Sequence, residues 1–181
     1  MKRFLALILV LSCVSLYAQD KEEVFPLSFS EVVRVDDAPA DVLFTRGRAW
    51  FATTYKDSKS VLQMAENGRL IGKAAESFNL NGGFALGTIA VRITYDISVE
   101  CRDGRYKYVI DNIVAKSHSG WANFGLLTTA ENYKEKGSGA KTLNKLWQDL
   151  KGSFTTFQMV LSMSLKEAMS KVEEPLSGDD W

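Results

Sequence analysis

Histidine, cysteine and proline are scarce in this sequence, and each shortage excludes a class of protein. The 181 residues contain one histidine, two cysteines and three prolines. With His118 alone, a multi-histidine metal site within one chain is impossible. The few prolines and the lack of low-complexity segments exclude a largely disordered chain. The length and composition therefore predict one folded domain with a real core, and no metal ion or cofactor is expected.

A net charge is also lacking. The chain has 22 basic and 22 acidic residues. Nucleic-acid binding needs a concentrated basic face, so this balance gives no electrostatic reason to expect a nucleic-acid partner. Loss of Lys2 and Arg3 with the leader described next would make the mature chain slightly acidic.

Residues 1–19 are typical of a secretory signal peptide. Lys2 and Arg3 precede a run over residues 4–14 that is apolar except for Ser12. The run is too short to span a bilayer as a permanent helix, which takes about 20 residues. We therefore expect export to the periplasm, the cell envelope or the extracellular space, and no transmembrane helix in the mature chain.

The two cysteines lie in different contexts. The segment Val10-Leu11-Ser12-Cys13 loosely resembles a lipobox, so lipoprotein processing at Cys13 is an alternative to simple cleavage and would anchor the domain to a membrane. If the leader is removed, Cys101 is the only cysteine left, and no intramolecular disulfide can form. Because Cys101 falls on the apolar phase of a strand, we expect a buried thiol.

Alternation and spacing of apolar residues predict the secondary structure. Apolar residues from Leu43 to Tyr55 recur at helical spacing after Pro39, which predicts a helix there. The dipeptide Asn67-Gly68 predicts a hairpin, and the Asn- and Gly-rich residues 76–87 predict a loop. The expected strands cover residues 27–35, 61–66, 69–75, 88–101 and 105–115.

The strand over residues 88–101 alternates perfectly, so one face should meet a core and the other water. In its partner strand the phase changes near Asp111, which predicts a β-bulge. Asp96 and Glu100, with Arg92 nearby, fall on the wet face. An ordinary solvated face is the favoured interpretation, although such a face could bind or catalyse.

A long helix over residues 140–172 is predicted from apolar residues that step by threes and fours. The element order is β-α-β-β-β-β-α, which favours an α+β two-layer sandwich with a curved antiparallel sheet. The predicted organisation is a signal peptide (1–19), an α+β core (20–115), a loop (116–139), the long helix (140–172) packed on the same domain, and an acidic mobile tail (173–181).

Four stretches carry a family resemblance: Val32-Val33-Arg34-Val35, Ala49-Trp50-Phe51-Ala52, Asn67-Gly68-Arg69-Leu70-Ile71-Gly72-Lys73 and Ile97-Ser98-Val99-Glu100-Cys101-Arg102-Asp103-Gly104-Arg105-Tyr106. On these stretches, over about residues 29–115, the chain resembles an exported bacterial family, the domain of unknown function 4468 with a TBP-like fold. The resemblance implies a curved antiparallel sheet backed by helices and implies no activity.

No catalytic residue is predicted, but three aromatic residues are candidates for contact with a ligand or partner. Trp121 and Phe124 lie in a glycine-containing loop, and Trp181 follows acidic residues. We interpret the protein as a non-catalytic envelope module that binds a protein or a small apolar ligand. One alternative is a lipid or hydrophobe carrier with a cavity between sheet and long helix. A weaker one is a hydrolase that uses His118 or the wet strand face.

Overall fold

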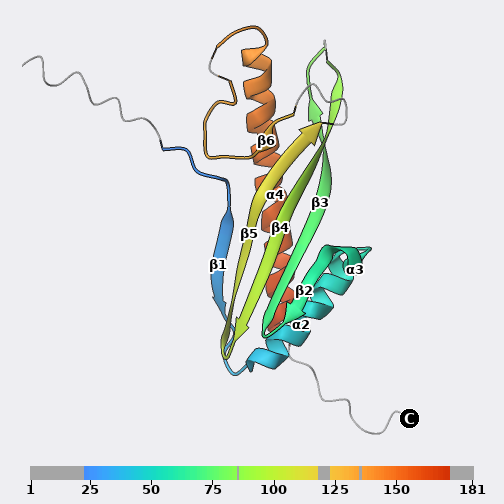
Figure 1. Cartoon of the computed structure of the whole chain (residues 1–181), viewed down its shortest axis with the longest axis vertical. Coiled ribbons are helices and arrows are strands. Elements are labelled where there is room, and N and C mark those ends of the chain that lie inside the picture. The colour runs from blue at the N-terminus through green and yellow to red at the C-terminus, as the bar shows by residue number, and fades with distance from the viewer. Residues whose placement is uncertain (1–22, 85, 118–122, 135, 172–181) are drawn as a thin grey trace, which may run out of the picture.

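The alternating segment around Tyr95 forms the central strand of an antiparallel sheet in this computed structural model (Figure 1). The structure describes residues 23–84, 86–117, 123–134 and 136–171. Its elements are β1 (Phe29–Arg34), α2 (Ala40–Thr54), α3 (Ser58–Val61), β2 (Leu62–Glu66), β3 (Arg69–Asn81), β4 (Thr88–Arg102), β5 (Arg105–Ser117), β6 (Gly125–Leu126) and α4 (Ala140–Ser170). The predicted α+β fold, an antiparallel sheet followed by a long helix, is confirmed.

The strands lie in the order β1-β5-β4-β3-β2, and β6 also pairs with β5. Every pairing is antiparallel. β1 lies beside residues 105–110 of β5, whereas β6 lies beside residues 114–115. These two short strands therefore share one edge of β5, and β2 covers only part of the opposite edge of the sheet.

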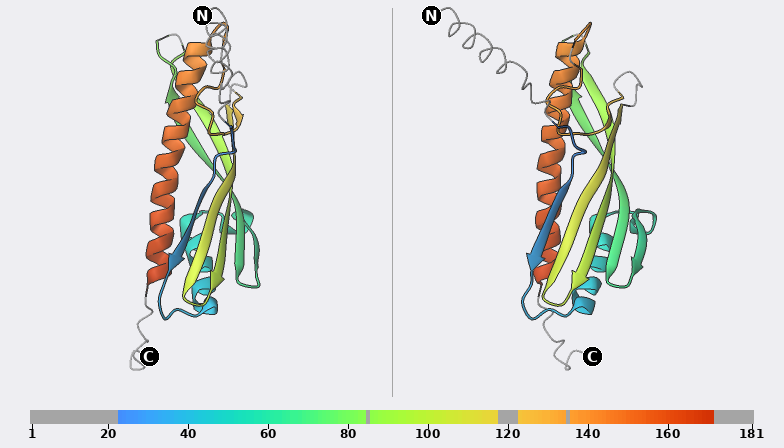
Figure 2. Two further views of the ribbon diagram at one scale, coloured as in Figure 1. Left: turned by 90° about the vertical axis from the view of Figure 1, so that its left-hand side faces the viewer. Right: turned by 60° about the vertical axis from the view of Figure 1, so that its left-hand side comes forward.

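One face of the sheet carries the core. The apolar residues of β4 on this face are all at most 6 % exposed: Ile89, Val91, Ile93, Tyr95, Ile97, Val99 and Cys101. Both α2 and α4 pack on this face (Figure 2). Trp50 and Phe51, predicted as core residues of the first helix, are 3 % and 0 % exposed. The two helices thus leave the other face of the sheet open.

Aromatic rings fill the space between α4 and the sheet. The ring of Phe154 lies 5.5 Å from that of Tyr95 and 6.3 Å from that of Phe78, measured between centroids. Phe157 lies 5.9 Å from Phe78. These distances are those of packed aromatic pairs. The carrier alternative places its cavity between these two elements, and it stays a prediction.

Side-chain contacts fix α4 near both of its ends. Near its start, Trp147 Nε1 donates a hydrogen bond to the carbonyl oxygen of Ala130 at 3.0 Å. Near its end, Lys166 Nζ lies 2.7 Å from a carboxylate oxygen of Glu31 on β1. The hydrogen bond from Lys166, followed by that from Tyr108, lowers the pKa of the Glu31 carboxyl. These contacts attach α4 to residues 123–134 near its start and to β1 near its end.

Some segments without a predicted helix or strand form regular structure. The loop predicted over residues 76–87 was wrong in its first half, because β3 continues to Asn81. Phe78 and Leu80 keep the alternation going and pair with Val91 and Ile89 of β4, so packing outweighs the polar composition. The polar stretch after α2 forms the single turn α3.

Within the expected loop 116–139, β6 and a bridge between Pro26 and Thr128 add to the sheet. The predicted bulge is confirmed: the β4–β5 register shifts between Thr94 and Asp96, and Asn112 takes a φ of 48°. The predicted leader with Cys13, and the predicted tail after Lys171, lie outside the described residues. No helix that the structure describes has the length and apolarity needed to cross a membrane.

Candidate functional site

The open face of the sheet is the face that α2 and α4 do not cover. Its side chains come from the alternate positions of the strands that do not enter the core. Half-buried apolar residues lie near its middle, among them Ile71 on β3 and Val109 on β5. Both pair with Ser98 of β4. This apolar centre lies between two groups of cations.

Basic side chains outnumber acidic ones on this face, although the chain as a whole is balanced. The basic set is Arg34, Arg69, Lys73, Arg92, Arg102, Arg105, Lys107 and Lys116, and the acidic set is Glu66, Asp96, Glu100 and Asp111. Because side chains alternate between the faces, the open face has an excess of basic residues. The net charge of the whole sequence does not reveal this local excess.

One group of cations lies at the hairpin end of the sheet. Register places Arg34 opposite Arg105, and Arg105 opposite Arg102, so three arginines stand in one row across β1, β5 and β4. We call these three residues the arginine row. Arg102 Nη2 donates to Glu100 at 2.8 Å, and this contact lowers the pKa of the Glu100 carboxyl. Within the described residues, no ion pair joins Arg34 or Arg105 to a carboxylate.

An open hollow of about 280 Å³ lies beside the arginine row. Its lining combines cations with apolar surface: Val32, Glu100, Arg102, Arg105, Tyr106 and Lys107. Val32 is 58 % exposed, so it adds accessible apolar surface to the hollow. The hollow can therefore take a carboxylate or another anion together with an adjoining apolar group.

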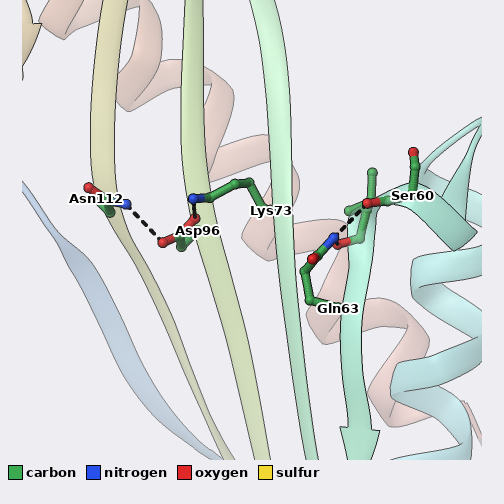
Figure 3. A network of polar contacts seen from close by, with 6 residues as sticks. Ser60, Gln63, Lys73, Asp96 and Asn112 are labelled. Atoms are coloured by element: carbon green, nitrogen blue, oxygen red, sulfur yellow. Dashed lines mark hydrogen bonds and ion pairs between the residues drawn. The ribbon is translucent and has the colours of Figure 1, made fainter.

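The second group of cations lies near the bulge in β5, and Figure 3 shows one of them, Lys73, beside Asp96 and Asn112. Asn112 Nδ2 donates to Asp96 Oδ2 at 2.9 Å, and Lys73 Nζ lies 3.5 Å from Asp96 Oδ1 as an ion pair without hydrogen-bond geometry. Burial, and then the charge of Asp96, raise the pKa of the Asp111 carboxyl. At the edge of the same view, Gln63 Nε2 donates to the carbonyl oxygen of Ser60 at 2.7 Å.

A second hollow, of about 290 Å³, lies over this bulge and is lined by Lys73, Arg92, Thr94, Asn112, Val114 and Lys116. Arg92 stands directly opposite Lys116 in the register. Eight residues separate Arg92 from Glu100 along β4, which is roughly 27 Å at about 3.4 Å per residue. The open face thus presents two cationic sites with apolar and acidic groups between them.

Of the three aromatic candidates from the sequence, the structure describes Phe124, which lines neither hollow. Phe124 is 5 % exposed, and its ring lies 5.0 Å from that of Tyr133 and 6.0 Å from that of Trp147. This cluster packs residues 123–134 onto α4. Trp121 and Trp181 lie outside the described residues, as does His118 of the hydrolase alternative. Ligand or partner contact at the three aromatic positions stays a prediction.

The sequence predicted that Arg92, Asp96 and Glu100 share a solvent-exposed strand face. It did not predict which cations of the other strands lie beside them. The row of Arg102 and Arg105 follows from the tight turn at Asp103-Gly104, a signal that the sequence does contain. The third arginine joins only because β1 pairs with β5. Among the described residues, no group of three or more His, Cys, Asp and Glu side chains is placed to bind a metal ion.

Comparison with known proteins supports the fold described for this sheet. Residues 29–116 match the model of a family described as a domain of unknown function (DUF4468) with TBP-like fold. We call this matched stretch the DUF4468 segment. It extends from β1 almost to the end of β5 and contains both hollows of the open face, whereas α4 lies outside it. No curated protein matches the chain.

Two crystal structures are similar to this chain. One is a DUF4468 family protein from Bacteroides ovatus, with a TM-score of 0.56 and 14 % identity over 83 % of this chain and 90 % of that one. The other is a TBP-like protein from Parabacteroides distasonis, with a TM-score of 0.48 and 14 % identity over 82 % and 95 % of the chains. At this identity the Bacteroides structure shows the shared fold alone.

Proposed function

We propose that this protein is an exported, non-catalytic binding module of the cell envelope whose open sheet face receives an acidic segment of another protein. The observation that carries the proposal is the arginine row. Like charges directly opposite each other destabilise a sheet, by an amount similar to the ~0.2–1 kcal/mol that favourable pairs contribute. A fold that keeps Arg34 opposite Arg105 gives up stability at a place where a partner can neutralise both.

Guanidinium groups suit carboxylates, because they form two parallel hydrogen bonds with them. The exposed Val32 beside the row adds an apolar contact, which is characteristic of a protein partner. Asp96 and Asp111 lie between the two cationic hollows. A uniform polyanion such as nucleic acid would meet these carboxylates midway, whereas a protein can place its acidic side chains at the two ends only.

Binding of a short acidic peptide tests the proposal. The probe is a fluorescently labelled peptide of glutamate and leucine, measured by anisotropy against the R34Q/R105Q variant. We expect the variant to bind at least about tenfold more weakly, because two charge-assisted hydrogen bonds of ~1.5–3 kcal/mol each are lost. The matched control R48Q/K59Q removes two exposed cations from α2 and α3 and should bind within about twofold of the wild type.

The same assay includes duplex DNA, anionic phospholipid vesicles and an uncharged leucine-serine peptide. Stronger binding of DNA or vesicles than of the acidic peptide would overturn the choice of a protein partner. Equal binding by R34Q/R105Q and R48Q/K59Q would overturn the site.

A further inference from the structure

The edge of the sheet formed by β3 is largely unpaired. β2 pairs with β3 only over residues 69–72, because β2 begins at Leu62, opposite Gly72. β3 itself continues to Asn81, fully paired with β4 on its other side. Figure 1 shows β3 as the outermost strand beyond the end of β2. In the described part of the chain, no strand pairs with residues 73–81 on this side.

Two hydrogen bonds reveal which backbone groups face this edge. Cys101 N–H donates to the carbonyl oxygen of Gly68 at 2.8 Å, and Gly82 N–H donates to that of Gly87 at 2.8 Å. Both contacts continue the β3–β4 register, one at each end. In an antiparallel ladder, such directly bonded pairs alternate with pairs that are not bonded to each other. Even-numbered residues of β3 therefore bond to β4.

The odd-numbered residues direct their N–H and C=O groups away from β4. Arg69 and Ile71 face β2 in this way, as the β2–β3 register requires. The residues that follow in the same phase are Lys73, Ala75, Ser77 and Asn79. Six steps at about 3.4 Å make this edge roughly 20 Å long. No proline or bulge interrupts it, although these devices usually protect an exposed edge from pairing.

We propose that this edge binds an extended segment of another protein as an additional strand, with acidic side chains on the open face and apolar ones on the helix side. Lys73 lies on the open-face side, and Arg92 and Lys116 line the same hollow. On the helix side, the half-buried Phe78 and Phe157 present ring surface to an apolar neighbour. Addition of a strand to a sheet edge is an established mode of peptide binding.

Charge complementarity favours a different chain over a second copy of this one. A second β3 edge would present Lys73, Ala75, Ser77 and Asn79 again on the open face, which supplies no carboxylate to the cations already there. The contact also uses a different part of the molecule from the arginine row. It therefore stands whether or not that row binds a partner.

A proline at Ser77 tests the inference, because its N–H should face the free edge and not β4. The probe is a labelled peptide that alternates valine and glutamate, measured by anisotropy. We expect S77P to weaken binding at least about tenfold, since one edge hydrogen bond and its neighbours are lost. S77T keeps the N–H and should bind within about twofold of the wild type.

Amide hydrogen exchange gives a readout that does not depend on any variant. In the free protein, the amides of Ala75 and Ser77 should exchange fast, whereas those of Ala74 and Glu76 should be protected by β4. Bound peptide should slow exchange at Ala75 and Ser77. Binding without this protection, or unfolding of S77P, would overturn the inference. Protection that grows with protein concentration in the absence of peptide would show a second copy as the occupant and overturn the choice of partner.

Discussion

At the scale of single residues, the open face is distinguished by side chains that stand opposite a like charge. Arg34 faces Arg105, Arg92 faces Lys116, and Asp96 faces Asp111. A face selected only for solubility would mix signs across each pair, as the Lys73–Asp96 contact does. The like-charged pairs are therefore the residues at which stability and binding are expected to oppose each other.

Cys101 gives a prediction about reactivity. The thiol is 6 % exposed, and burial, followed by the charge of Glu100, raises its pKa to about 11 from an ordinary value of 9.0. At about pH 8 the thiolate fraction is thus roughly a hundredfold lower than in an unfolded chain. With Cys13→Ser, so that Cys101 is the only thiol, Ellman's reagent should react at least that much faster in concentrated guanidinium chloride. Comparable rates in native and denaturing buffer would contradict this burial.

Residue spacing predicted which side chains are buried, but it did not reveal the arginine row. The helical spacing of Trp50 and Phe51 and the strand phase of Cys101 place these side chains in the core, where the structure has them. Periodicity contains this information because burial follows the geometry of one element. The arginine row needs the register of three strands, which no single stretch of sequence contains.

At the scale of the elements, two helical glycines predict opposite effects of one substitution. A Cβ on Gly152 of α4 would meet nothing within 4 Å, so Gly152→Ala should raise the free energy of unfolding by about 1 kcal/mol. A Cβ on Gly47 of α2 would lie 2.6 Å from Leu70 Cδ1, so Gly47→Ala should lower it by about 1–3 kcal/mol. Urea unfolding midpoints measure both. A lower midpoint for Gly152→Ala would show that this side of α4 is not free.

The type of each long element was predictable, and its ends were less so. The perfect alternation of β4 and the spacing along α4 predicted a strand and a helix that the structure confirms. The end of β3 was missed because asparagine and glycine dominate the composition after Glu76. Contact of Phe78 with Phe154 and Phe157, more than 70 residues away in sequence, keeps that segment extended.

At the scale of the whole molecule, the DUF4468 segment depends on a helix outside the family match. The large apolar side chains that α4 buries include Leu146, Trp147, Leu150, Phe154, Leu161, Leu165 and Met169. Burial of each of these side chains contributes ~1.5–3 kcal/mol. Together they contribute an amount similar to the ~5–15 kcal/mol that usually stabilises a domain. A protein that ends at Gly139 should therefore lack near-UV circular dichroism and a cooperative unfolding transition.

A less drastic variant, Phe154→Ala, should keep the fold and lower the free energy of unfolding by about 3–5 kcal/mol, because the ring is fully buried. Cooperative unfolding of the protein that ends at Gly139 would show instead that the sheet and α2 are sufficient. From the sequence alone, the arrangement was predictable only in that a long helix would carry an apolar stripe. Which face of the sheet the stripe covers follows from three-dimensional packing.

The pairing of β1 with β5 has a consequence for the order in which the molecule can form. Phe29 pairs with Ile110, so the first strand to be synthesised has no partner until nearly the whole sheet has followed. The strands from β2 to β5 can form by successive pairing of neighbouring strands. β1 can pair only after the chain between Phe29 and Ile110 has brought its ends together. During synthesis the chain therefore passes through a stage in which β5 ends the sheet with its backbone unprotected, and completion of the domain is a late, non-local event.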